Sequence, residues 1–165
     1  MKDPFAVQGK LHPKAVAALR AALSDPDAGV RGLSATGLGN MKARDAVGDL
    51  FTALEHKVAE AAASIGQLCA AADCERLTAK LGSVPFDVIT GGLDQILFRP
   101  ASDVPDDLKI KIVGSVRELG TGEANRFLRD VQGKCPRDWS SRVKQAIDQA
   151  VLATASSPGA GGGSQ

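Results

Sequence analysis

The feature that most constrains this chain is the spaced recurrence of a large aliphatic residue followed by glycine. The pairs Leu38-Gly39, Ile65-Gly66 and Leu119-Gly120 recur after 27 and then 54 residues, so the second interval is twice the first. A period of about 20 to 50 residues is typical of arrays in which each repeat is one supersecondary unit. The sequence therefore predicts stacked repeats.

The segments between these pairs have the pattern of α-helices. Apolar residues recur every three or four positions, which places them on one helical face. Gly91 and Gly92 weaken the pattern in one segment, because glycine within a helix costs about 1 kcal/mol relative to alanine. We expect helices within residues 13–23, 28–38, 43–54, 56–69, 85–98, 105–120, 122–131 and 141–155, and a short one within 73–85.

Residues suited to helix ends lie between these segments. The turn Asp25-Pro26-Asp27 offers carboxylates that accept hydrogen bonds from the free amides of a helix start. Thr121, and Ser140 or Ser141, are expected to act in the same way. Gly39 and Gly120 are expected to close the preceding helices, because glycine readily adopts the left-handed conformation.

Composition favours closely packed helices. Of the 165 residues, 44% are hydrophobic but only 4% are aromatic, and alanine and leucine predominate among the apolar side chains. Twenty Lys and Arg against nineteen Asp and Glu give a net charge of +1, so no global field attracts nucleic acid or an acidic membrane. The opening residues lack an apolar leader, and no run of about 18 apolar residues could span a bilayer.

The few cysteines and histidines do not form a recognisable metal or redox motif. Cys69, Cys74 and Cys135 contain no CxxC pair, so we expect reduced, mostly buried thiols and a cytoplasmic protein. A redox or thiol-ligation role for Cys69 and Cys74 is the alternative. His12 and His56 are isolated from other ligands, and we expect surface histidines, with no metal and no cofactor.

The residues Asp25-Pro26-Asp27, Val30-Arg31, Ala35 and Leu38-Gly39 resemble the HEAT-repeat family, in the short bacterial form that is also similar to phycobilisome lyase-type repeats. The resemblance is best over residues 13–54 and poorest over 73–100. It implies an all-α, right-handed α-solenoid of about four or five antiparallel helical pairs over residues 1–155, followed by a flexible Gly/Ser-rich tail, 156–165.

The resemblance also implies roles for individual residues. Asp25 or Asp27 would link neighbouring units together with Arg31. Val30, Ala35 and Leu38 would point into the core, while Gly39, Gly66 and Gly120 would mark the ends of second helices. Residues facing away from the core would line the concave side and bind a partner: Gly32, Thr36, Asn40, Ala63, Gln67 and Arg117. The alternative is that the short Ala and Gly side chains there only relieve crowding inside the curve.

We expect a non-catalytic protein-protein interaction module, an adaptor or scaffold subunit, because no nucleophile or phosphate-loop motif is present. One alternative is a bilin lyase-like role in chromophore attachment, which the resemblance suggests. Another is nucleic-acid binding through the basic C-terminal helices, for example by Arg137 and Lys144, although mixed charges there favour ordinary solvated helix faces.

Overall fold

The computed structural model describes residues 12–156, and this part of the chain is all-helical. No strand forms within it; the one β-bridge, between Leu81 and Val84, is isolated. The expected tail and the opening segment lie outside the described residues, apart from His12 and Ser156. The helices are α1 (Pro13–Ala22), α2 (Ala28–Asn40), α3 (Val47–Glu55), α4 (Glu60–Leu68), α5 (Ala71–Thr78), α6 (Phe86–Leu97), α7 (Asp106–Glu118), α8 (Gly122–Lys134) and α9 (Ser141–Ala155), with a 3-10 turn, η1 (Arg44–Ala46), before α3.

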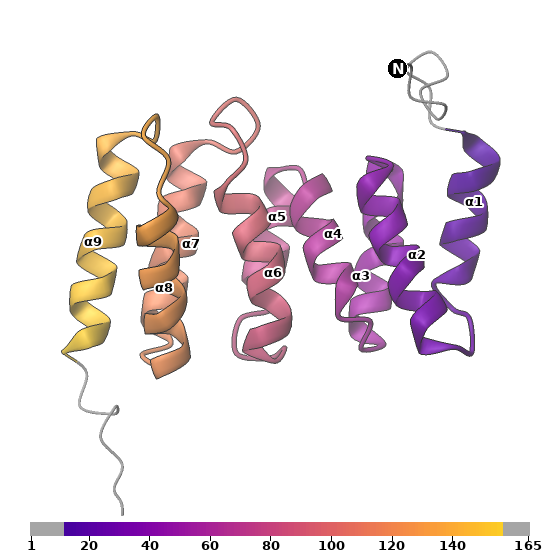
Figure 1. Cartoon of the computed structure of the whole chain (residues 1–165), viewed down its shortest axis with the longest axis horizontal. Coiled ribbons are helices and arrows are strands. Elements are labelled where there is room, and N and C mark those ends of the chain that lie inside the picture. The colour runs from indigo at the N-terminus through magenta and orange to yellow at the C-terminus, as the bar shows by residue number, and fades with distance from the viewer. Residues whose placement is uncertain (1–11, 157–165) are drawn as a thin grey trace, which may run out of the picture.

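The helices follow one another along the long axis of the molecule, from α1 at one end to α9 at the other (Figure 1). Helices α2, α4, α6 and α8 form a row nearest the viewer, and α3, α5 and α7 lie behind them. The main packing contacts join helices adjacent in sequence or one helix apart, such as α2 with α4, α4 with α6, and α7 with α9. None of the helices in residues 12–156 is long and apolar enough to cross a membrane.

One apolar core runs the length of this array, because each helix turns one stripe toward its neighbours. Every helix after α1 contributes buried residues to this core, whereas α1 has none of its own. Burial of each large aliphatic or aromatic side chain stabilises the fold by about 1.5–3 kcal/mol. The largest apolar side chains with less than 2% exposure are Leu38, Leu50, Phe51, Ile65, Leu77, Ile89, Leu93, Ile96, Leu97, Ile112 and Leu128.

The predicted helix starts are confirmed where polar caps were expected. The Asp27 carboxylate accepts a hydrogen bond from the Val30 amide at 3.0 Å. Thr121 caps α8 and Ser140 caps α9 in the same way, through the amides of Ala124 and Val143. These side chains satisfy amides that the first helical turn leaves free.

Of the three repeated glycines, only Gly120 ends a helix as expected. It follows α7 with a φ of 61°, a conformation that suits glycine. The expectation is wrong for Gly39 and Gly66, which lie inside α2 and α4 and are buried. They serve close helix packing instead.

The packing of α4 against α6 depends on two glycines. A Cβ atom placed on Gly66 would lie 2.3 Å from the carbonyl oxygen of Gly92, and one on Gly92 would lie 2.5 Å from the carbonyl oxygen of Ala62. These are backbone atoms, which cannot rotate away, so neither position has room for a side chain. Gly92, which weakens the helical pattern of residues 85–98, is thus required by the packing of α4 against α6.

Two expectations from the repeat signature are wrong. Val30 is 38% exposed instead of pointing into the core, whereas Ala35 and Leu38 are fully buried as expected. Arg31 does not link neighbouring units through Asp25 or Asp27 carboxylates: its Nη1 donates to the backbone carbonyls of Asp25 and Pro26 at 2.8 and 2.9 Å. Arg31 therefore closes the turn before its own helix.

The expectation of reduced thiols is also wrong for two of the three cysteines. Cys69 and Cys74 are joined by a disulfide, and both are buried as expected. Cys135 is free and half-buried. The sequence spacing does not reveal this pair, because it depends on the α4–α5 turn, which brings the two Cα atoms to 5.2 Å from each other.

The Gly66–Gly92 contact predicts the effect of adding a single methyl group. Gly66→Ala should lower the free energy of unfolding by about 1–3 kcal/mol, because overpacking outweighs the gain in helix propensity. Urea unfolding followed by far-UV circular dichroism measures this change.

Gly114→Ala is the matched control, since a Cβ at this position in α7 meets nothing within 4 Å. It should leave stability unchanged or raise it by up to about 1 kcal/mol. Equal stability of the two variants would contradict the close approach of α4 and α6.

Candidate functional site

The surface that unites most of the expected partner-binding residues lies on the row α2, α4 and α6. We call it the α2–α4–α6 face, and it points away from the core. In each helix it occupies the side opposite the buried stripe, as helical periodicity requires. Its residues are Leu33, Thr36, Asn40, Glu60, Ala63, Gln67, Asp87, Gly91, Asp94 and Gln95, all exposed or half-exposed.

Four of the six residues expected to bind a partner lie on this face. Thr36, Asn40 and Gln67 are exposed, and Ala63 is half-buried. Residues of neighbouring helices lie close together on this face. A Cβ on Gly39 of α2 would lie 2.6 Å from Gln67 Oε1 of α4, and a Cβ on Gly91 of α6 would lie 3.7 Å from Ala63 Cβ of α4. The face is therefore continuous from α2 across α4 to α6.

The other two expected residues lie elsewhere. Gly32 is buried, and the Glu60 carboxylate occupies the space that a side chain would need, with Oε1 only 2.7 Å from the ideal Cβ position. Arg117 is exposed but belongs to α7, which lies behind the row of the face in Figure 1. Gly32 and Arg117 are thus not part of the α2–α4–α6 face.

The contribution of α6 to this face was missed by sequence reasoning, because the repeat pattern is poorest over residues 73–100. Asp87, Gly91 and Asp94 recur at intervals of four and three residues, on the side opposite buried Ile89, Leu93 and Ile96. The helical register of residues 85–98 contains this signal, even though the repeat alignment does not.

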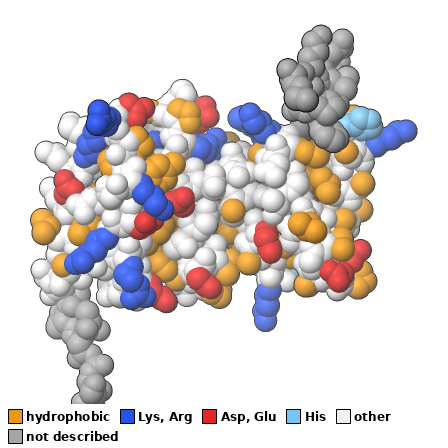
Figure 2. Space-filling model, in the orientation of Figure 1, with side chains coloured by type: hydrophobic (Ala, Val, Ile, Leu, Met, Phe, Trp, Pro, Cys, Tyr) orange, Lys and Arg blue, Asp and Glu red, His pale blue; other side chains and the backbone are white. Residues whose placement is uncertain are grey.

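The face is small and uncharged at its centre and acidic around it. In Figure 2 the surface over α4 and α6 is mostly white, while Lys and Arg side chains gather over the C-terminal helices. Glu60, Asp87 and Asp94 carry the charges of the face. The one basic residue within α2, α4 and α6 is Arg31, which is held by the turn carbonyls. The charged side chains of the face itself are therefore all acidic.

Asp94 is the acid whose environment is most perturbed. Burial raises the pKa of the Asp94 carboxyl above 3.8, Lys134 opposes this rise, and Asp130 adds to it. Lys134 is shared, because its Nζ lies 2.6 Å from Asp130 Oδ2 on α8. The net effect on Asp94 is that of partial desolvation, which disfavours its charged form.

The basic C-terminal helices form a different surface. Several of their cations are already engaged: Lys134 with Asp130, Arg142 with Asp107 at 2.8 Å, and Lys144 with the Arg137 carbonyl at 2.8 Å. Such partners reduce the positive charge that a phosphate backbone would meet.

Two clefts lie outside the α2–α4–α6 face. One, of about 470 Å³, is lined by Arg20, Asp49 and His56, where Arg20 Nε lies 2.6 Å from Asp49 Oδ2 and His56 Nδ1 lies 2.9 Å from the Thr52 carbonyl. The other, of about 520 Å³, is lined by Lys80 and Val88 among others, and Lys80 pairs with Glu55 at 3.4 Å. Each cleft thus contains one ion pair.

A scan against models of protein families found no match for the chain, and a search of curated proteins found none either. The chemistry of the α2–α4–α6 face therefore has to be inferred from its own residues.

The environment of Asp94 predicts a pH-dependent effect on stability. A carboxyl whose pKa is raised on folding binds its proton more tightly in the folded state, so its ionisation lowers stability as the pH rises through the folded-state value. Asp94→Asn should therefore raise the free energy of unfolding at pH 7, by about 0.5 kcal/mol because solvent screens a partly exposed group.

The advantage of Asp94→Asn should vanish in acid, below the ordinary value of 3.8. Chemical unfolding at several pH values measures it. Asp87→Asn is the control: Asp87 lies in the first turn of α6, where a negative charge is favourable, so this variant should gain nothing. A pH-independent effect of Asp94→Asn would contradict desolvation as the cause.

Proposed function

We propose that the chain is a HEAT-like adaptor or scaffold module, a right-handed α-solenoid of about four or five helical pairs that binds a partner protein without catalysing a reaction. The α2–α4–α6 face carries this proposal, because it is continuous, has a small uncharged centre and is bordered by acids. Elongated helical arrays commonly use such extended surfaces for binding. The functional part of the proposal is an analogy at the level of fold.

The arrangement of the helices supports the solenoid part of the proposal. Pairs such as α1 with α2, α3 with α4 and α7 with α8 pack as neighbours, and contacts between pairs, such as α8 with α9, continue along the array. Each pair then buries one face against the next, as in repeat proteins whose units do not fold alone. The number of pairs follows from nine helices in residues 12–156.

The chemistry of the face favours a particular kind of partner. Ala63 and Gly91 project little from the surface, so a partner's helix or strand can approach the α4–α6 seam closely. Leu33, which is 75% exposed, offers an apolar contact at the α2 edge. We propose a peptide segment of a partner protein that places Lys or Arg side chains opposite Glu60, Asp87 and Asp94.

The same charges argue against nucleic acid as the ligand of this face, since its phosphates would be repelled. The bilin lyase-like alternative rests on the resemblance alone. A cytoplasmic location stays a prediction, and the Cys69–Cys74 disulfide removes the argument from reduced thiols that supported it.

Ala63→Arg should weaken partner binding at least tenfold while leaving the fold intact. The long cation would occupy the centre of the face and repel a basic partner segment. Proteins are captured from the native host with wild-type and variant baits at matched concentrations, and the affinity of each co-eluting partner is measured with purified components.

Ala79→Arg is the matched control, because Ala79 is exposed directly after α5, in the rear row of Figure 1. It adds the same side chain away from the face and should not change affinity. If both variants lost binding equally, or if neither lost binding, the α2–α4–α6 face would be ruled out as the binding surface.

A further inference from the structure

The Cys69–Cys74 disulfide lies where α4 turns into α5. Cys69 directly follows α4, and Cys74 lies in the first half of α5, with its amide bonded to the Ala70 carbonyl at 2.9 Å. The two residues are 1% and 0% exposed. Between them lie Ala70, Ala71 and Ala72, which are exposed and have small side chains, and Asp73, which is half-exposed.

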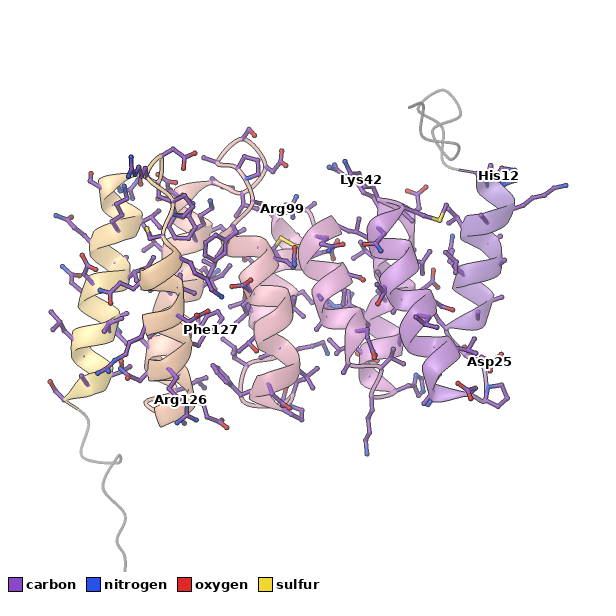
Figure 3. All side chains as sticks on the ribbon, in the orientation of Figure 1. His12, Asp25, Lys42, Arg99, Arg126 and Phe127 are labelled. Atoms are coloured by element: carbon purple, nitrogen blue, oxygen red, sulfur yellow. A yellow bond between two sulfur atoms is a disulfide. The ribbon has the colours of Figure 1, made fainter. Side chains whose placement is uncertain are left out.

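A guanidinium group contacts both sulfur atoms. Arg99, two residues beyond α6, places Nη1 3.7 Å from Cys69 Sγ and 3.9 Å from Cys74 Sγ. The same nitrogen donates to the Cys69 carbonyl at 2.7 Å and the Gly66 carbonyl at 3.3 Å. Figure 3 shows Arg99 beside the yellow sulfur-sulfur bond at one end of α4 and α6.

This cation is held without a close carboxylate. The ion pairs found in residues 12–156 do not include Arg99. Burial lowers the pKa of the Arg99 guanidinium; the field of Asp103 opposes that effect, and the field of Arg44, a second cation, adds to it. A positive charge with carbonyls and neutral sulfurs as its neighbours gains most if one of those sulfurs becomes an anion.

Arg99 is also connected to the C-terminal helices. Its carbonyl accepts a hydrogen bond of 2.6 Å from Lys109 Nζ, and Lys109, on α7, is only 2% exposed. Lys109 Nζ lies 5.0 Å from the Trp139 ring centroid, and Phe98 packs on the same ring at 5.1 Å. A displacement of the Arg99 backbone would therefore change the contacts of Lys109, Phe98 and Trp139, where α6, α7 and the segment before α9 meet.

We propose that Cys69–Cys74 is a redox switch whose reduced form Arg99 stabilises as a thiolate. A dithiol reductant attacks one sulfur through its thiolate, forms a mixed disulfide and releases the other cysteine sulfur. The second thiol of the reductant then cleaves the mixed disulfide. Two electrons pass to the protein, the reductant becomes a disulfide, and the products are one cysteine thiol, one thiolate facing Arg99 and one proton in solvent.

Reduction has a structural consequence in this arrangement. The guanidinium that now bonds to the Gly66 and Cys69 carbonyls would turn toward the new thiolate, and the α4–α5 turn would lose its covalent link. The amides at the start of α5 should then exchange hydrogen faster.

The proposal is tested with protein carrying Cys135→Ser, so that the only thiols are those of the pair. The protein is equilibrated in buffers of reduced and oxidised dithiothreitol, and the fraction reduced is measured by alkylation and mass spectrometry. At an alkaline pH above the pKa of the released thiol in both proteins, Arg99→Met should make reduction about tenfold less favourable, because an adjacent opposite charge shifts an ionisation by about one pH unit or more. Arg99→Lys should lie closer to wild type.

The pH dependence separates an electrostatic role from a structural one. The difference between Arg99→Met and wild type should shrink in acid, where the released thiol stays protonated. Arg117→Met, which removes an exposed arginine from α7, should match wild type throughout. A tenfold effect that persists unchanged in acid would overturn the thiolate mechanism, and so would no effect of Arg99→Met at alkaline pH.

Hydrogen exchange on the wild-type pair provides a test that needs no arginine variant. Faster exchange at Cys74 and the neighbouring amides after reduction, in a protein that keeps its helical circular dichroism, supports the switch. Reduction that occurs only when the whole protein unfolds would overturn it and make the disulfide a purely structural link.

Discussion

The structure depends most on the close approach of α4 and α6, where the backbone of each helix touches the other. Gly66 faces the carbonyl of Gly92, and Gly92 faces the carbonyl of Ala62, with no space for a methyl group on either glycine. Interiors are packed too densely to absorb such an atom without separating the helices. The buried residues Ile65, Leu77 and Leu93 lie around this contact, so the middle of the core depends on it.

The same contact determines the character of the outer surface. Helices that approach through glycine leave a shallow seam above them, and Ala63 and Gly91 cover that seam with very little bulk. The proposed binding surface is thus a product of the packing beneath it. The negative charge of this surface comes from individual side chains. The Glu60 carboxylate lies over Gly32, and the partly buried Asp94 carboxyl lies in the field of Lys134.

Much of the local structure could be predicted from the sequence, because periodicity and capping act over a few residues. Asp27, Thr121 and Ser140 were identifiable as caps from the chemistry of their side chains alone. The roles of Gly39 and Gly66 were not, because a glycine at a helix end and one at a helix crossing look alike until the neighbouring helix is known. The disulfide and the position of Arg117 likewise depend on how the chain turns in space, and the contribution of α6 to the α2–α4–α6 face was hidden by an irregular repeat.

The closely packed row that carries the α2–α4–α6 face ends at α6, and this sets the length of a segment that can lie across the face. In the N-terminal half, α2, α4 and α6 pack on one another in the front row, whereas beyond α6 the main contact between alternate helices is that of α7 with α9. Three helices about 8–10 Å apart span about 25–30 Å including their own width. That distance corresponds to about 17–20 residues of a bound helix or about 8–9 residues of an extended strand. The footprint of the proposed partner is therefore that of a short linear motif, which a partner domain would have to present at its surface.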